Sequence, residues 1–259
     1  MGTGKNIYIM TDLEGISGID SMDMIQKGHP RYEYSLERLM ADTNAAIEGA
    51  FQGGAGQVFV CDGHAGGGNF IHGLLDPRAV ISAGGMSKQL DENFDAVMFI
   101  GAHAMAGTLN GFLDHTQNSR QWYNYYVNGK RTGELGQWGM MAGQYKLPVV
   151  MVSGDQAACF EARQFFGHIS CAVVKHGIGR NSAELVPEEE AVALIKNAAA
   201  RAMELIGEIK PYMPLLPLDI KLELYRSDFC DEAAKKPGVE RLDARTVRKV
   251  SSNYIDILF

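Results

Sequence analysis

The sequence has no long hydrophobic run, and its first five residues form no apolar signal core. A membrane-spanning helix needs about 20 consecutive apolar residues, and no stretch approaches that length. Asn6 stands where an N-terminal lipidation motif requires serine or threonine. We therefore expect no membrane partner.

Cysteine is scarce: the four cysteines are scattered singly at positions 61, 159, 171 and 230. Because none of them is in CxxC spacing, neither a disulfide framework nor a thiolate zinc site is expected. Reduced, buried thiols are typical of a cytoplasmic protein, which is the location we expect.

Positive charge is also in short supply. The chain carries 24 Lys and Arg against 31 Asp and Glu, a formal net charge of −7. The densest basic stretch, 245–249, holds three interrupted positive residues, too few to follow a phosphate backbone. We exclude nucleic acid as the main partner.

Apolar runs and amphipathic segments alternate along the first 210 of the 259 residues. Runs at 5–10, 57–61, 96–101, 149–152 and 169–174 predict strands, with helices expected at 31–51, from 134 to 145, at 156–166 and from 187 onward. Strand–helix–strand units of this length imply parallel pairing. The predicted fold class is α/β, a mainly parallel sheet with flanking helices.

A proline-rich segment, 211–217, interrupts this pattern. Beyond it, 218–224 alternates as a half-exposed strand, 227–234 predicts a short helix and 239–249 a further β stretch. We therefore predict a metal-binding α/β domain at 1–210 and a smaller C-terminal α+β unit at 211–259. The aromatic stretch 122–127, followed by an Asn-Gly turn, is predicted to be a hairpin within the first domain.

Several predicted strands end on residues that can bind metal. Asp12 and Glu14 follow the first strand, Asp62 and His64 the second, and His103 another. In an open α/β sheet, ligands bind outside the carboxyl ends of the strands, so these side chains can converge on one crevice. Each has an ordinary explanation as well, such as turn chemistry for Asp62 and its following glycine.

Glu134 is expected at a helix N-terminus, where the helix dipole already favours a carboxylate. A metal role for it therefore needs support from elsewhere. The glycine cluster at 63–68 lacks the Walker lysine and the GxGxxG order, so we do not favour a phosphate site there.

The candidate ligands are carboxylates and imidazoles, which suit zinc and, less specifically, manganese or iron. Three carboxylates contribute a charge of −3, and two divalent ions with one hydroxide balance it, so charge favours two metals. The candidates are Asp12, Glu14, His64, His103 and Glu134, with Asp62 as a possible sixth.

The order and spacing of five motifs resemble those of the M55 family of D-aminopeptidases, over nearly the whole chain. These motifs are Asp12-Leu13-Glu14-Gly15, Asp62-Gly63-His64, Gly101-Ala102-His103-Ala104, Asp114-His115 and Gly133-Glu134-Leu135-Gly136. The resemblance implies an aminopeptidase that binds two Zn²⁺ per chain and assembles as a homodecamer of two pentamers. The implied substrate is a short peptide, such as D-Ala-D-Ala, with an N-terminal D-residue.

Carried over by position, the resemblance implies that Asp12 bridges the two ions. Glu14 and His64 then complete one site, and His103 and Glu134 the other. His115 is implied to be the catalytic residue, as nucleophile or base. A histidine has a pKa in the range that proton transfer near neutral pH requires.

Two features depart from the family pattern. Met10 occupies a position where the family has serine, and we expect it to alter packing and not coordination. The chain ends at Phe259, where similar proteins continue into a longer helix, so domain closure or oligomer contacts are expected to differ.

Two alternatives remain open. The same cluster could serve a dinuclear hydrolase of another amide, an L-peptide or a phosphoester. A metal-free α/β binding protein is the third hypothesis, in which Asp12 and Glu14 hold a polar ligand. The residues leave D- versus L-specificity undecided, because it depends on loops around the site.

Overall fold

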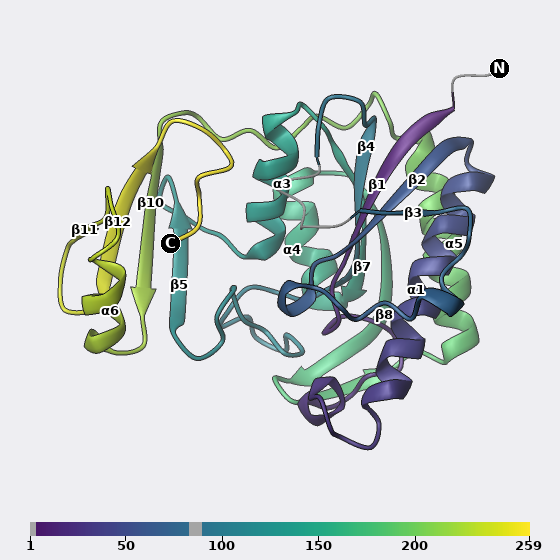
Figure 1. Ribbon diagram of the computed structural model, residues 1–259, viewed down its shortest axis with the longest axis horizontal. Coiled ribbons are helices and arrows are strands. Elements are labelled where there is room, and N and C mark those ends of the chain that lie inside the picture. The colour runs from purple at the N-terminus through teal and green to yellow at the C-terminus, as the bar shows by residue number, and fades with distance from the viewer. Residues whose placement is uncertain (1–3, 83–89) are drawn as a thin grey trace.

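The computed structural model of the protein describes residues 4–82 and 90–259. Two sheets lie side by side, a large one carrying most of the helices and a small one formed mainly by the C-terminal part of the chain (Figure 1). The fold class predicted from the sequence, a mainly parallel α/β sheet with flanking helices, is confirmed.

The large sheet has seven strands in the order β3-β2-β1-β4-β7-β8-β9. All neighbours pair in parallel except β8 and β9, which form an antiparallel hairpin at one edge. In chain order the strands are β1 (Lys5–Thr11), β2 (Ala55–Asp62), β3 (Val80–Ile81), β4 (Ala96–Ala102), β7 (Val149–Asp155), β8 (Ser170–Gly179) and β9 (Ser182–Leu185).

Helices cover both faces of this sheet. Helices α1 (Tyr32–Gln52) and α5 (Glu188–Glu204) pack together on one face, and α3 (Glu134–Gln144) and α4 (Gln156–Phe166) lie on the other (Figure 1). Alternate residues of β1 enter different cores: Ile7 and Ile9 face α1 and α5, while Tyr8 and Met10 lie in the core with α3 and α4. This burial on both faces explains why the strands are continuous apolar runs in the sequence.

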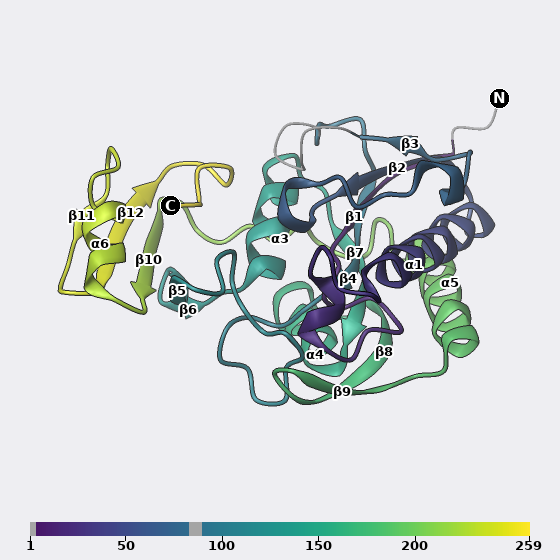
Figure 2. The same ribbon diagram turned by 60° about the horizontal axis from the view of Figure 1, so that its bottom comes forward.

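Short 3₁₀ helices interrupt the connections that follow β1 and β2. They are η1 (Met22–Ile25), η2 (His64–Gly66) and η3 (His72–Leu74). The loop that contains η1 lies beside the β8–β9 hairpin, at the same end of the molecule (Figure 2). The loop after β1 and the β8–β9 hairpin therefore border the carboxyl ends of the central strands.

The small sheet is antiparallel, in the order β11-β12-β10-β5-β6. It comprises β5 (Trp122–Val127), β6 (Lys130–Arg131), β10 (Leu218–Leu224), β11 (Glu240–Arg241) and β12 (Thr246–Ser251), with α6 (Ser227–Ala233) beside it. The predicted hairpin is present as β5 and β6, but β5 pairs with β10 and so belongs to this sheet. The division at residue 210 remains a prediction, although the sheet takes strands from both sides of it.

Met10, at the position that departs from the family pattern, is buried in β1 and pairs with Cys61 and Phe99 on the neighbouring strands. Its place in the core agrees with a packing role. Cys61, Cys159 and Cys230 are buried, as expected, whereas Cys171 is half-buried. Within the described ranges, the helices are all too short or too polar to cross a membrane.

Candidate metal centre

The carboxyl ends of β1, β2 and β4 bring the predicted ligands together. The segment after β1 bends tightly against the end of β4, because the Gly15 amide donates to the Gly101 carbonyl at 2.8 Å. A Cβ at Gly15 would lie 1.9 Å from the Ala102 carbonyl oxygen, and one at Gly101 would lie 2.2 Å from that of Asp12. Both glycines are therefore needed for Asp12 and Glu14 to approach His103.

Asp12 stands between two histidines. One of its carboxylate oxygens, Oδ1, lies 3.2 Å from His64 Nδ1, and the other, Oδ2, lies 3.4 Å from His103 Nε2. Burial alone would raise the pKa of Asp12, but the contacts with His103 and His64 outweigh it and hold this pKa well below its usual range. The two oxygens of one buried carboxylate thus face different sides of the cluster.

His64 completes the more open side. Its Nδ1 lies 3.0 Å from Glu14 Oε2, and 15% of its side chain is exposed. Burial lowers the pKa of His64, but hydrogen bonds with Asp12 and Glu14 raise it to about 11 overall. This half of the cluster holds one imidazole between two carboxylates.

His103 lies on the buried side, with 1% of its side chain exposed. Its Nδ1 is 3.1 Å from the Ala104 carbonyl oxygen, which fixes Nδ1 as the protonated nitrogen when the ring is neutral. Its Nε2 lies 3.4 Å from Asp12 Oδ2 and 3.5 Å from Glu134 Oε1, yet it makes no hydrogen bond within the described part of the chain. Despite burial, the negative charges of Glu134 and Asp12 hold the pKa of His103 well above its usual value.

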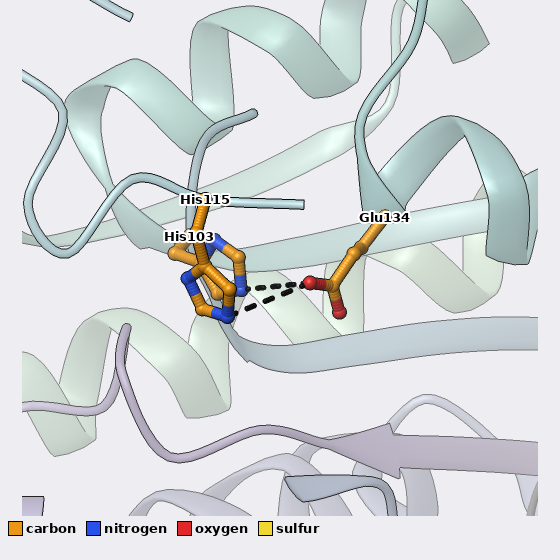
Figure 3. A group of neighbouring side chains, drawn as sticks. All are labelled: His103, His115 and Glu134. Carbon is orange, nitrogen blue, oxygen red and sulfur yellow. Dashed lines mark ion pairs between the residues drawn. The ribbon is translucent and has the colours of Figure 1, made fainter. Parts of the chain in front are cut away.

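Glu134 is the first residue of α3, as predicted, and it faces two stacked histidines (Figure 3). The His103 and His115 rings stack with centroids 4.0 Å apart, and His115 Nε2 lies 3.7 Å from Glu134 Oε1. His115 Nδ1 is 2.8 Å from the Leu113 carbonyl oxygen, so Nε2 is the ring nitrogen directed at the cluster. The Glu134 carboxylate also accepts a hydrogen bond from the Gln117 amide at 2.7 Å.

The possible sixth ligand, Asp62, has another function. Its two carboxylate oxygens accept hydrogen bonds from the backbone and side-chain amides of Asn69, at 2.6 and 3.0 Å. Asn69 also donates to the His64 carbonyl oxygen at 3.0 Å. Asp62 therefore stabilises the loop that presents His64.

The cluster suits a divalent metal ion. Ligand atoms of Asp12, Glu14 and His103 lie within 4.8 Å of one another, and the same holds for His103, His115 and Glu134. The pKa values of His64 and His103 are raised because the neighbouring carboxylates favour positive charge, which protons or metal ions can supply. A buried imidazole nitrogen that faces two carboxylates without a hydrogen bond fits a ligand better than a structural histidine.

Two buried ionisable residues support the ligand loops from behind, and the sequence analysis did not single them out. Lys175, in the middle of β8, donates from Nζ to the carbonyl oxygens of Glu14 and Ile19 at 3.0 and 2.8 Å. Glu161, in α4, accepts from the Met105 amide at 2.7 Å. Burial lowers the pKa of Lys175 to about 7 and raises the pKa of Glu161 to about 7.

Two adjoining cavities open onto the cluster. One of about 250 Å³ lies over it and is lined by Asp12, Glu14, His64, His115 and Glu134, among others. The second, of about 440 Å³, shares Glu14, His64 and His115 with the first and extends to the loop after β1. The loop after β1, residues 15–30, thus contributes Met22, Ile25, Gln26 and Lys27 to a cavity wall.

Comparison with known proteins gives the same relationship in sequence and in structure. A D-aminopeptidase from Bacillus subtilis (strain 168) is 30% identical over 239 residues, which are 90% of this chain and 86% of that protein. The solved structure described as "Zn-dependent D-aminopeptidase DppA from Bacillus subtilis, a self-compartmentalizing protease" superposes with a TM-score of 0.92 at 28% identity, covering 97% of this chain and 93% of that one. The sequence model of peptidase family M55, D-aminopeptidase, matches residues 6–259. The predicted resemblance is confirmed, and this chain belongs to the M55 peptidase family of D-aminopeptidases.

Proposed function

We propose that the protein is a zinc-dependent aminopeptidase that removes an N-terminal D-residue from short peptides such as D-Ala-D-Ala. The observation that carries this proposal is the buried Nε2 of His103, which faces Asp12 and Glu134 at 3.4 and 3.5 Å without a hydrogen bond. The zinc-dependent D-aminopeptidase of similar structure supports the choice of metal and of substrate.

Two Zn²⁺ per chain would be held by five residues. Asp12 would bridge them, because its two oxygens face His64 and His103. Glu14 and His64 would complete the open site, and His103 and Glu134 the buried one. When bound, the ions supply Lewis-acid activation of the scissile carbonyl and of a water molecule.

His115 would move the protons of the reaction through its Nε2. The Leu113 carbonyl, 2.8 Å from Nδ1, keeps the proton of the neutral ring on Nδ1 and leaves Nε2 free to accept one. As a general base, Nε2 would take a proton from the attacking water and then deliver it to the leaving amine. The same orientation would also serve Nε2 as a nucleophile, the other role that the family resemblance implies.

The cavity beside the cluster would hold the peptide. Glu14, whose carboxylate lines both cavities, is placed to bind the free amine of the substrate. Selection for a D-residue would follow from the cavity wall, where Tyr32 donates to Asn69 at 3.1 Å and fixes one side.

We also propose that the protein works in the cytoplasm as a homo-oligomer, a decamer of two pentamers. The structural relative is described as self-compartmentalizing, a property that requires subunits to enclose a space. Light scattering of the purified, zinc-loaded protein would measure the mass, and a monomer would contradict the assembly.

The central experiment combines metal analysis with matched substrates. The purified protein should contain about two zinc per chain and release D-alanine from D-Ala-D-Ala faster than L-alanine from the L-dipeptide. Aryl phosphates tested in parallel should remain intact. Cleavage of the phosphates, or of the L-peptide alone, would replace the D-peptidase assignment, and a stable protein that binds no zinc would contradict the metal site.

A further inference from the structure

The cavity of about 440 Å³ beside the metal centre has an asymmetric distribution of charge. On the metal side its wall contains Glu14, His64 and His115. The remaining charged residues of the wall, Lys27 and Arg180, are both positive. Neither cation lines the smaller cavity directly over the cluster, so metal binding gives no reason for their positive charge.

Arg180 is attached to the segment that carries His115. It lies in the turn between β8 and β9, and its carbonyl oxygen accepts the Leu113 amide at 2.7 Å. Its Nε donates to the Asp114 carbonyl oxygen at 3.3 Å and lies 3.7 Å from Asp114 Oδ1. These contacts fix the base of the guanidinium group relative to the catalytic histidine.

The outer part of this guanidinium group is unused. Within residues 4–82 and 90–259, Nε is the one side-chain nitrogen of Arg180 that makes a hydrogen bond, so both Nη groups remain available, and 39% of the side chain is exposed. The Asp114 carboxylate already accepts the Gly107 amide at 2.6 Å. A planar fork with free N–H groups, fixed at one side of a substrate cavity, matches the geometry of a carboxylate.

We propose that Arg180 binds the C-terminal carboxylate of the substrate, so that the enzyme selects dipeptides with a free C-terminus. The inference rests on the proposed function, which places the substrate amine and the scissile bond at the metal centre. In a dipeptide one residue separates that bond from the carboxylate, a reach of about 3.5 Å per residue in extended chain. Lys27 adds positive charge to the wall of the same cavity, but its flexible ammonium lacks the fork.

The test compares D-Ala-D-Ala with its C-terminal amide, which differs only in losing the negative charge. Zinc-loaded wild-type enzyme should show a kcat/KM about 10- to 100-fold higher for the acid, as for a charge-assisted hydrogen bond. Arg180→Gln should lose this preference through a higher KM for the acid, while kcat/KM for the amide stays within about twofold of wild type.

Two variants serve as controls. Lys27→Met removes one positive charge from the same cavity and should reduce the preference less than about threefold, since exposed single charges contribute little. Arg180→Lys keeps the charge without the fork and should retain part of the preference.

Four outcomes would overturn the inference. Equal cleavage of acid and amide by the wild type shows that no carboxylate is recognised, while leaving the proposed D-aminopeptidase intact. An equal loss of kcat/KM for the acid and for the amide in Arg180→Gln shows that Arg180 acts through Asp114 on His115. If Lys27→Met loses as much of the preference for the acid as Arg180→Gln does, the overall positive charge of the cavity, and not the guanidinium fork, recognises the carboxylate. If the wild type cleaves neither substrate, the proposed function fails and the inference fails with it.

Discussion

The two halves of the metal centre share Asp12 but differ in exposure and in support. In the open half, 15% of the His64 side chain is exposed, and its Nδ1 is 3.0 to 3.2 Å from two carboxylates. In the buried half, 1% of the His103 side chain is exposed, and its Nε2 faces two carboxylates at longer distances. The open half borders the larger of the two cavities, whereas the buried half lies within the core.

The halves are also supported by buried groups of opposite charge. Lys175 binds the Glu14 carbonyl behind the open half, and Glu161 binds the Met105 amide behind the buried half. Burial shifts the pKa of each toward neutrality, to about 7 in both cases, because each charged form is poorly solvated. Because one group is a base and the other an acid, their contributions to stability should change in opposite directions as pH rises.

Loss of the shared carboxylate should have the largest effect. Asp12→Asn should reduce zinc from about two per chain to nearly none and kcat/KM by about 1000-fold or more, because both halves lose a ligand. Elemental analysis and a D-Ala-D-Ala assay measure the two effects. Asp62→Asn is the matched control, since Asp62 contacts Asn69, and it should retain both ions. Retention of one zinc in Asp12→Asn would contradict the bridging role.

Removal of the His115 side chain should reduce catalysis without reducing zinc binding. His115→Ala should reduce kcat by about 100- to 10,000-fold, the range for a general base, while zinc content stays at about two. Because His115 Nε2 lies 3.7 Å from Glu134 Oε1, it is also within reach of the buried metal. A variant that lost one zinc would show that His115 is a ligand, and a fully active variant would remove it from the mechanism.

Chelation should distinguish the two halves directly. With a chelator, zinc release from the wild type should be biphasic, and the faster phase should belong to the open half, where His64 is more exposed than His103. Glu14→Gln should remove the fast phase and leave about one zinc, whereas Glu134→Gln should remove the slow phase. A single phase in all three proteins would mean that the halves release zinc as one unit.

The smallest effects concern pH and the two buried supports. The folded-state pKa of Glu161 is raised from 4.5 to about 7, so its contribution to stability is fully present below pH 4.5 and is lost as pH rises toward 7. Between pH 5 and 8, the free energy of unfolding of the zinc-loaded wild type should therefore fall by about 2–3 kcal/mol relative to that of Glu161→Gln, as measured with urea.

Lys175 should behave in the opposite sense. Its folded-state pKa is lowered from 10.5 to about 7, so the unfolded chain binds more protons between these values and stability rises with pH. From pH 7 to 10, the free energy of unfolding of the wild type should rise by about 3 kcal/mol relative to that of Lys175→Met. The comparison with a variant cancels the pH dependence of zinc binding that both proteins share. If the difference in free energy of unfolding changed with pH in the same direction for both pairs of proteins, the opposite roles of Glu161 and Lys175 would be contradicted.

Much of the fold was predictable, because strands buried on both faces are continuous apolar runs. The hairpin 122–127 was also recognised, from its alternation and its Asn-Gly turn, but its sheet was not. β5 pairs with β10, almost 100 residues away, and a half-exposed alternating strand carries no information about which edge it joins.

Four of the five ligand candidates were predictable because the topology of a parallel sheet brings its carboxyl ends to one edge, whereas Glu134 begins α3 and was identified by the family resemblance. Asp62, beside them in sequence, binds Asn69 instead, a difference that depends on how the loop of 63–69 folds back. Arg180, Lys175 and Glu161 carried no motif, since each contacts the ligand-bearing loops from an element that is distant in the chain.

The sequence by itself determined the strand ends, the ligand types and the family, because these depend on local periodicity and on residues at fixed spacing. Only the tertiary structure decided which half of the cluster is open, which buried groups support each half, and which cations line the adjoining cavity. Those properties arise from packing between elements far apart in the chain, where burial and charge are set by neighbours that local sequence does not specify.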